Sequence, residues 1–205
     1  MELMPHDLLE IRASADLVSF TEIPEWVENA IASAPFVVVR RAQAGEGLVA
    51  VGVRGQQRNE RFASFLPVER IIRRISPEQL SREREWVGKS KDIFKYLELI
   101  NRIMNKYSLV WGPTGSLGFE LASKKDATTE SSDIDIVIRL KKELTKELAN
   151  SILTELNNEV KIRVDVQVDM KEGGFSLTEY ATNGEKPILI RTINGPKLMK
   201  IECLD

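Results

Sequence analysis

A change in hydrophobic pattern at residues 76–90 limits what this chain can fold into. Before it, two apolar runs of strand length, Phe36–Val39 and Leu48–Val53, flank a glycine-containing connection, which is typical of a β-hairpin. After it, helical and strand-like spacings of apolar residues alternate. The stretch itself is polar, and Ser81–Glu85 is almost wholly charged. We therefore expect a domain boundary here; a charged helix face inside one domain is the alternative.

The predicted domains cover residues 1–80 and 81–205, and the predicted fold class is α+β. The first is a small α/β domain with the hairpin and a helix at Pro24–Ala34, for which Thr21 is the expected N-cap. The second combines helices with a small mixed sheet. Its expected helices are Asp92–Tyr107, Ser116–Leu121 and Lys141–Glu159, and its expected strands are Ser108–Trp111, Asp133–Leu140, Lys161–Val168 and Pro187–Arg191.

Composition narrows the function classes. The chain has 29 Lys and Arg against 31 Asp and Glu, a net charge of −2, whereas nucleic-acid-binding domains are usually strongly basic. Its one cysteine, Cys203, cannot form an internal disulfide, and its one histidine, His6, cannot build a metal site from several imidazoles. The sequence contains no signal-peptide pattern and no apolar run of membrane-spanning length. We expect a cytoplasmic protein with no nucleic-acid or membrane partner.

Three aspartates in the second half are spaced so that they meet if two strands are neighbours. Asp133 and Asp135 stand two residues apart at the start of one expected strand, so their side chains point to the same face. Asp165 lies in a later strand, on the face opposite the valines. Carboxylates held this close repel one another unless they share a proton or bind a cation. Oxygen ligands alone favour a hard ion, so we predict that all three bind Mg²⁺, with Mn²⁺ as second choice.

A glycine–serine turn in the same half of the chain has the features of a phosphate-binding site. Gly115 and Ser116 stand where an expected strand gives way to a helix. Glycine lets the backbone approach a ligand closely, and the N–H groups at a helix N-terminus can hold a phosphate. Gly115 and Ser116 are therefore the predicted substrate-binding residues, and Asp133, Asp135 and Asp165 are the predicted catalytic residues.

These residues resemble the active-site signature of the polymerase-β-type nucleotidyltransferases. Longer segments, which occur in both halves of the chain, are similar to a narrower family, the malonate decarboxylase holo-acyl-carrier-protein synthases. The segments are Pro5–Leu9, Gly52–Gly55, Trp111–Ala122, Ser132–Arg139, Arg163–Gln167, Leu189–Thr192 and Gly195–Pro196. Residues Ser123–Ser131 match no part of that pattern.

The resemblance implies a nucleotidyltransferase fold for the second domain and a phosphoribosyl-dephospho-CoA transferase activity. In that family, a serine hydroxyl of the malonate decarboxylase acyl carrier protein attacks the α-phosphate of 2′-(5″-triphosphoribosyl)-3′-dephospho-CoA and releases diphosphate. On this scheme Asp133 and Asp135 bind the metal, and Asp165 helps to deprotonate or orient the serine. Gly115 and Ser116 hold the β- and γ-phosphates. The first domain supplies specificity for the substrate or the carrier protein.

Two other functions fit the same residues. A nucleotidyltransferase with another acceptor needs the same carboxylates; that acceptor would be the citrate lyase carrier protein, another protein, an RNA or a small molecule such as an antibiotic. A catalytically silent nucleotide-binding module would keep the fold, although an intact set of three aspartates argues against it. Arg54, Arg58 and Arg61 have two interpretations: they contact phosphates or an acidic carrier protein, or they belong to a solvated loop.

Overall fold

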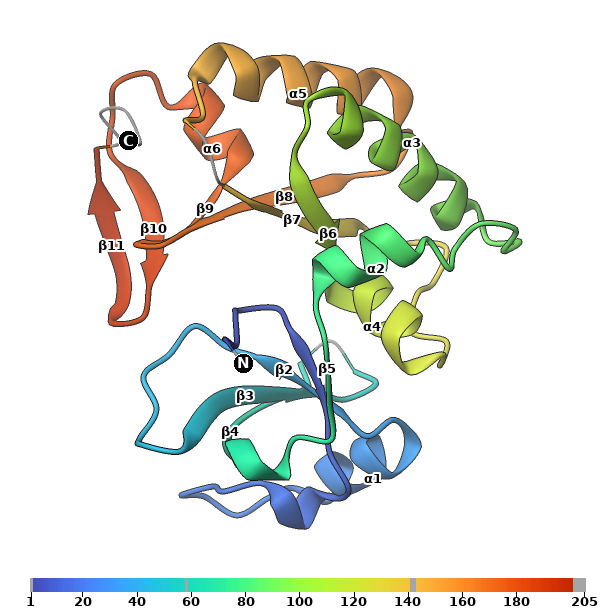
Figure 1. Ribbon diagram of the computed structural model, residues 1–205, viewed down its shortest axis with the longest axis vertical. Helices are drawn as coiled ribbons and strands as arrows, with labels where there is room; N and C mark the ends of the chain where they lie inside the picture. The colour runs from blue at the N-terminus through green and yellow to red at the C-terminus, as the bar shows by residue number, and fades with distance from the viewer. Residues whose placement is uncertain (1, 58, 141–142, 201–205) are drawn as a thin grey trace. The chain divides into compact units, whose positions relative to one another are not determined.

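The structure is a computed structural model that describes residues 2–57, 59–140 and 143–200 (Figure 1). It consists of two compact units, one made of Met1–Ser76 with Ala122–Lys125 and the other of Pro77–Leu121 with Asp126–Asp205. Each unit is built around a sheet of its own. Within the described residues, no helix is both long and apolar enough to cross a membrane.

The first unit contains a five-stranded sheet in the order β4-β3-β2-β1-β5. Its elements are β1 (Leu8–Glu10), η1 (Ser14–Asp16), α1 (Glu25–Ser33), β2 (Phe36–Val39), β3 (Leu48–Arg54), β4 (Arg61–Pro67), η2 (Val68–Arg70) and β5 (Arg73–Ile75). Neighbouring strands are antiparallel throughout, and β2 pairs with β3, so the expected hairpin is confirmed. The expected α/β arrangement of this unit is wrong, because it requires parallel strands joined by crossover helices.

Helix α1 packs on one face of this sheet through the buried side chains of Val27 and Ile31. Its N-cap is Pro24, whose carbonyl accepts a hydrogen bond from the backbone N of Val27 at 2.9 Å. The prediction that Thr21 caps the helix is wrong. Thr21 lies three residues too early, and its backbone N donates to the hydroxyl of Ser19 at 3.2 Å.

The second unit contains a six-stranded sheet in the order β11-β10-β9-β8-β7-β6. Its strands are β6 (Val110–Pro113), β7 (Ile134–Arg139), β8 (Val164–Met170), β9 (Gly173–Ser176), β10 (Ile188–Thr192) and β11 (Gly195–Met199). β7 and β8 run parallel, whereas the other neighbours are antiparallel, so the sheet is mixed as expected. Helices combined with this sheet agree with the predicted α+β class.

Five helices accompany this sheet among the described residues: α2 (Pro77–Glu83), α3 (Asp92–Lys106), α4 (Gly115–Ser123), α5 (Lys146–Glu159) and α6 (Leu177–Thr182). α3 and α5 lie side by side over one face of the sheet (Figure 1). Glu155 of α5 joins them, because its carboxylate accepts hydrogen bonds from Nζ of Lys106 and from the hydroxyl of Tyr107, both at 2.5 Å.

Some helices and strands begin a few residues away from the bounds expected from the sequence. α5 begins at Lys146 because the hydroxyl of Thr145 accepts a hydrogen bond from the backbone N of Leu148 at 3.2 Å and caps the helix. The start of the expected helix, at 141–142, lies outside the described residues. β6 begins at Val110 rather than Ser108, because Ser108 has a left-handed φ of +53° that a strand cannot accommodate.

Candidate active site

Strands β7 and β8 bring Asp135 and Asp165 together. The two residues are register partners in adjacent parallel strands, so their side chains project from the same face of the sheet. The opposite face of this strand pair is apolar, as in the partners Ile136 and Val166, which are both buried. Because side chains alternate between the two faces, burial of the isoleucines and valines leaves the aspartates together on the other one.

Gly115 lies directly against the carboxylate of Asp135. The backbone N of Thr114 donates to the carbonyl of Asp135 at 2.8 Å, which ties the end of β6 to β7. Gly115 follows with a φ of +59°, a conformation that favours glycine. A Cβ atom added to Gly115 would stand 2.0 Å from Oδ2 of Asp135. Position 115 therefore accepts only glycine without displacing this carboxylate.

Ser116 continues from this contact into the first turn of α4. The helix begins at Gly115, and the backbone N of Gly118 donates to the carbonyl of Thr114 at 2.8 Å. Ser116 itself is buried. The first N–H groups of a helix have no carbonyl partner inside that helix and carry a partial positive charge. The start of α4, an end of a helix that can attract an anion, thus lies beside the Asp135 carboxylate.

The third predicted aspartate lies just outside strand β7. Asp133 is exposed and precedes the first residue of that strand. Asp165 forms an ion pair with Arg163, whose Nη2 stands 3.0 Å from Oδ1 of Asp165. Among the residues that the structure describes, no three His, Cys, Asp or Glu side chains are grouped so that they could hold a metal ion. The structure therefore brings Asp135 and Asp165 together on one face of the sheet, and the grouping of all three aspartates around a metal stays a prediction.

The loop before Asp133 is anchored by Glu120, a residue that the sequence analysis missed. Glu120 lies in α4, and its buried carboxylate accepts hydrogen bonds from the loop. The donors are the backbone N of Ala127 (2.9 Å), the backbone N of Thr128 (2.8 Å) and the hydroxyl of Thr128 (2.7 Å). Nζ of Lys91 donates to the other carboxylate oxygen at 2.8 Å and also to Asp126 at 2.8 Å. These contacts fix the segment that leads into β7.

The ionisation of Glu120 reflects these contacts. Burial by itself raises the pKa of a carboxyl group, but the hydrogen bonds from Lys91, Ala127 and Thr128 outweigh it and lower the pKa of Glu120 from 4.5 to about 2. The carboxylate therefore stays charged at neutral pH. A lone acidic residue in the otherwise uncharged segment Gly115–Ser123 was the available sequence signal. Its partner Lys91 lies 29 positions away in sequence, which only the fold reveals.

An ion triad of two buried residues, Arg139 and Asp169, and the half-buried Glu78 continues the polar face beyond the aspartate pair. Arg139 of β7 and Asp169 of β8 are register partners, and the guanidinium of Arg139 contacts the carboxylate of Asp169 through Nη1. Nε of Arg139 donates to Oε1 of Glu78, in α2, at 2.5 Å. Buried charges are tolerated only when they are paired in this way. The triad attaches α2 to the sheet and has no catalytic assignment.

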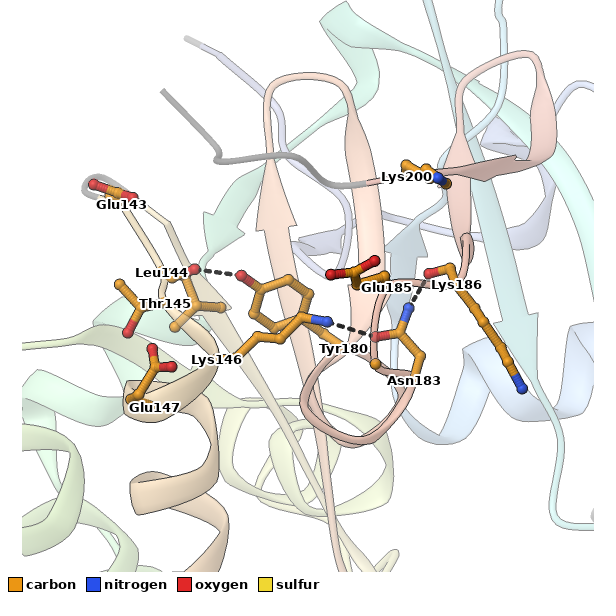
Figure 2. A pocket seen from close by; sticks show the side chains of 11 residues that line it. Glu143, Leu144, Thr145, Lys146, Glu147, Tyr180, Asn183, Glu185, Lys186 and Lys200 are labelled. Atoms are coloured by element: carbon orange, nitrogen blue, oxygen red, sulfur yellow. Dashed lines mark hydrogen bonds between the residues drawn. The ribbon is translucent and has the colours of Figure 1, made fainter.

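A cavity of about 640 Å³ lies elsewhere in the second unit, at the start of α5 and the end of α6 (Figure 2). Tyr180 closes one side, where its hydroxyl donates to the carbonyl of Leu144 at 2.6 Å, and Lys146 donates to Oδ1 of Asn183 at 3.2 Å. None of the predicted site residues lines it, and its walls carry equal numbers of lysines and glutamates. The lining residues are Glu143, Leu144, Thr145, Lys146, Glu147, Tyr180, Asn183, Gly184, Glu185, Lys186 and Lys200.

Comparisons with known proteins match nearly the whole length of the chain. A family model described as the phosphoribosyl-dephospho-CoA transferase MdcG N-terminal domain matches residues 4–77. The model described as the C-terminal domain of the same transferase matches residues 79–202. No solved structure matches the chain.

Curated relatives carry the same description. A phosphoribosyl-dephospho-CoA transferase from Pseudomonas fluorescens (strain Pf0-1) is 37% identical over 142 residues, which cover 69% of this chain and 67% of the relative. The transferase from Pseudomonas aeruginosa is 38% identical over 135 residues, covering 66% and 63%. That from Azotobacter vinelandii is 37% identical over 143 residues, covering 68% and 66%. The chain thus matches about two thirds of the length of these relatives.

Proposed function

Because the chain belongs to the phosphoribosyl-dephospho-CoA transferase family, we propose that it attaches a phosphoribosyl-dephospho-CoA prosthetic group to a carrier protein. As a member of this family it is a transferase. The proposed donor is 2′-(5″-triphosphoribosyl)-3′-dephospho-CoA, and the proposed acceptor is a serine of the malonate decarboxylase acyl carrier protein.

The reaction is a nucleotidyl-type transfer. The serine oxygen forms a bond to the α-phosphorus, the bond from that phosphorus to the bridging oxygen breaks, and diphosphate leaves. The serine proton passes to a base, for which Asp165 is the candidate because it faces Asp135 across the strand pair. The N–H groups at Gly115 and Ser116 bind the β- and γ-phosphates, which places the leaving group at the start of α4.

One observation supports this proposal above the others: the contact between Gly115 and Asp135. A phosphate-binding turn and a carboxylate from another strand are packed so closely that a single methyl group at position 115 would not fit. In-line attack at a triphosphate needs both features within one small space. The nucleotidyltransferase fold remains a prediction.

Magnesium remains part of the proposal. The donor set is all oxygen, which suits this ion, and Asp135 and Asp165 share one face of the sheet. Asp133 would complete the set, although no three-residue group exists among the described residues as they stand. A bound Mg²⁺ would offset the negative charge of the triphosphate and the departing diphosphate.

The test is mass spectrometry of the carrier protein after incubation with the transferase, Mg²⁺ and the triphosphate donor. The account predicts that the apo-carrier protein of malonate decarboxylase gains the mass of one prosthetic group on a single serine. The citrate lyase carrier protein is incubated in parallel. Modification of that protein alone would replace the proposed acceptor, and modification of neither would overturn the transfer.

A further inference from the structure

The face of the six-stranded sheet that carries Asp135 and Asp165 continues onto β10 and β11, the last strands of that sheet (Figure 1). Side chains two residues apart in a strand share a face, so Asp169 lies on the same side of β8 as Asp165. Asp169 is the register partner of Gly174 in β9, and Gly174 is the register partner of Arg191 in β10. Because register partners project from the same face, Arg191 belongs to the face of the aspartates.

The other face of these strands packs against helix α6. On β9 it carries the buried Phe175, whose ring centroid lies 5.5 Å from that of Tyr180 in α6. On β10 it carries Ile190, which is also buried. Arg191, the next residue, is exposed. The Arg191 side chain therefore projects from the side of the sheet opposite to α6.

Exposed apolar side chains stand beside Arg191. Leu189 lies two residues before it on the same face, and the register partner of Leu189 in β11 is Leu198. Leu189 is 36% exposed and Leu198 is 72% exposed. Among the residues that the structure describes, no hydrogen bond or ion pair involves the side chain of Arg191. An exposed guanidinium next to an exposed apolar pair suits a ligand that joins an anionic group to an apolar chain.

The proposed donor is a ligand of this kind. Beyond the ribosyl triphosphate that reacts, it carries the diphosphate and the pantetheine arm of dephospho-CoA. About 12 covalent bonds join the α-phosphorus to the first phosphorus of that diphosphate, which is about 15 Å in an extended conformation. Arg191 lies four residues along the strands and two strands across from Asp165, a separation of about 16 Å on the sheet. The two lengths match.

We propose that Arg191 binds the diphosphate of the dephospho-CoA part of the donor, and that the pantetheine arm lies on Leu189 and Leu198. This inference rests on the proposed function for the identity of the donor. The reacting phosphates then lie at Asp135 and the start of α4, and the CoA end lies on the β10–β11 hairpin. Arg58 of the first unit, an arginine considered for phosphate binding from sequence alone, lies outside the described residues.

The experiment compares full-length Arg191→Gln with wild type and with Lys197→Gln. Lys197 is an exposed cation of the same hairpin, and its register partner Ile190 lies on the buried face, so it serves as the matched control. KM and kcat are measured from diphosphate release at saturating carrier protein, with two donors. One is the complete donor, and the other is 2′-(5″-triphosphoribosyl)adenosine, which lacks the diphosphate and the pantetheine arm. Binding of dephospho-CoA alone is titrated by calorimetry.

We expect Arg191→Gln to raise the KM for the complete donor by about tenfold, since a hydrogen-bonded charge contact is lost. The kcat should stay constant, because this contact is equally strong before and during the reaction. The KM for the truncated donor should be the same in variant and wild type. Dephospho-CoA should bind the variant about tenfold more weakly. Lys197→Gln should match wild type throughout, and neither exposed change should lower the unfolding temperature.

An unchanged KM for the complete donor would overturn this assignment. An equal rise in KM for both donors would also overturn it, since Arg191 would then contact the part that the two donors share. The same loss in Lys197→Gln, or a wild-type protein that does not bind dephospho-CoA, would count against it as well. Binding of dephospho-CoA that depends on Arg191, in a protein that releases no diphosphate, would uphold this site while overturning the proposed function.

Discussion

At the scale of single residues, Gly115 meets two structural requirements at the proposed site. Its positive φ and its contact with Asp135 are separate requirements. The first is a backbone preference that any L-residue would violate. The second is specific to this place, because the atom in the way is the carboxylate oxygen of a predicted catalytic residue.

Replacing Gly115 with Ala should separate these two requirements. The variant should lose about 1–2 kcal/mol of stability from the left-handed backbone and at least about 100-fold in diphosphate release from displacement of Asp135. Gly184→Ala is the control, since Gly184 has a φ of +63° and nothing within 4 Å of an added Cβ. It should lose similar stability and little activity. Equal activity of both variants would show that the Asp135 contact does not matter.

The aspartates show what residue-level reasoning predicts. Alternation along a strand correctly places Asp135 on the face opposite the isoleucines, and the assumption that its strand neighbours that of Asp165 is confirmed. The same reasoning placed Asp133 with them, but β7 begins only at Ile134. A residue before the first strand position is not bound by the alternation. The grouping of all three remains a prediction.

At the scale of elements, the loop between α4 and β7 is held in position by the carboxylate of Glu120. The hydrophobic pattern of the sequence does not reveal this contact. Glu120 looks like one polar residue on an apolar helix, yet it binds two backbone N–H groups and Lys91. Sequence periodicity predicts helices and strands because it reports burial of faces. It carries no information about a contact between residues 29 positions apart, so the anchor could not be predicted.

Glu120→Gln should lower stability at neutral pH by on the order of 2–3 kcal/mol. The pKa of this carboxyl is lowered to about 2 by its hydrogen bonds, so its contribution is fully present above the unfolded value near 4.5 and is lost as the pH falls toward 2. Denaturant unfolding at a series of pH values measures how this contribution to stability changes. As the pH falls from about 4.5 to about 2, the wild type should lose more stability than Glu120→Gln. The control is Glu130→Gln, an exposed change in the same loop, which should behave as wild type. Parallel curves for Glu120→Gln and wild type would rule out the anchor.

The triad of Arg139, Asp169 and Glu78 belongs to the same scale because it fastens α2 to the sheet. Arg139→Met removes the cation that contacts both carboxylates and should destabilise the protein by about 3–5 kcal/mol. The variant Arg139→Met/Asp169→Leu/Glu78→Leu, which removes all three charges, should recover much of that loss. Chemical denaturation of both variants decides the matter; a triple variant no more stable than the single one would contradict this account of the triad.

At the scale of the whole molecule, two units with separate sheets carry separate proposed tasks. The second holds the aspartate pair and the proposed phosphate-binding turn, and the first is the proposed source of specificity for the substrate or the carrier protein. Sequence pattern predicted the mixed sheet of the second unit but described the first as α/β. The error has a physical source: short apolar runs show that strands are buried, and they do not show whether neighbours run parallel.

Removal of divalent metal should abolish activity and leave the fold intact. Treatment with EDTA should reduce diphosphate release to background, and added Mg²⁺ or Mn²⁺ should restore it. The thermal unfolding temperature should barely change, because the pairing of β7 with β8 already holds Asp135 and Asp165 in place. Full activity in EDTA would remove magnesium from the proposal.

The most direct test of the central claim measures diphosphate release by Asp135→Asn at saturating Mg²⁺, with Ile134→Val as its neighbour control. Asparagine keeps the size of the side chain but removes the charge, so the account predicts a fall of at least about 100-fold with the fold retained. Ile134 points to the opposite, buried face, and its change should cost only about 1 kcal/mol of stability and little rate. Near-normal turnover by Asp135→Asn would contradict the assignment of this carboxylate to the reaction.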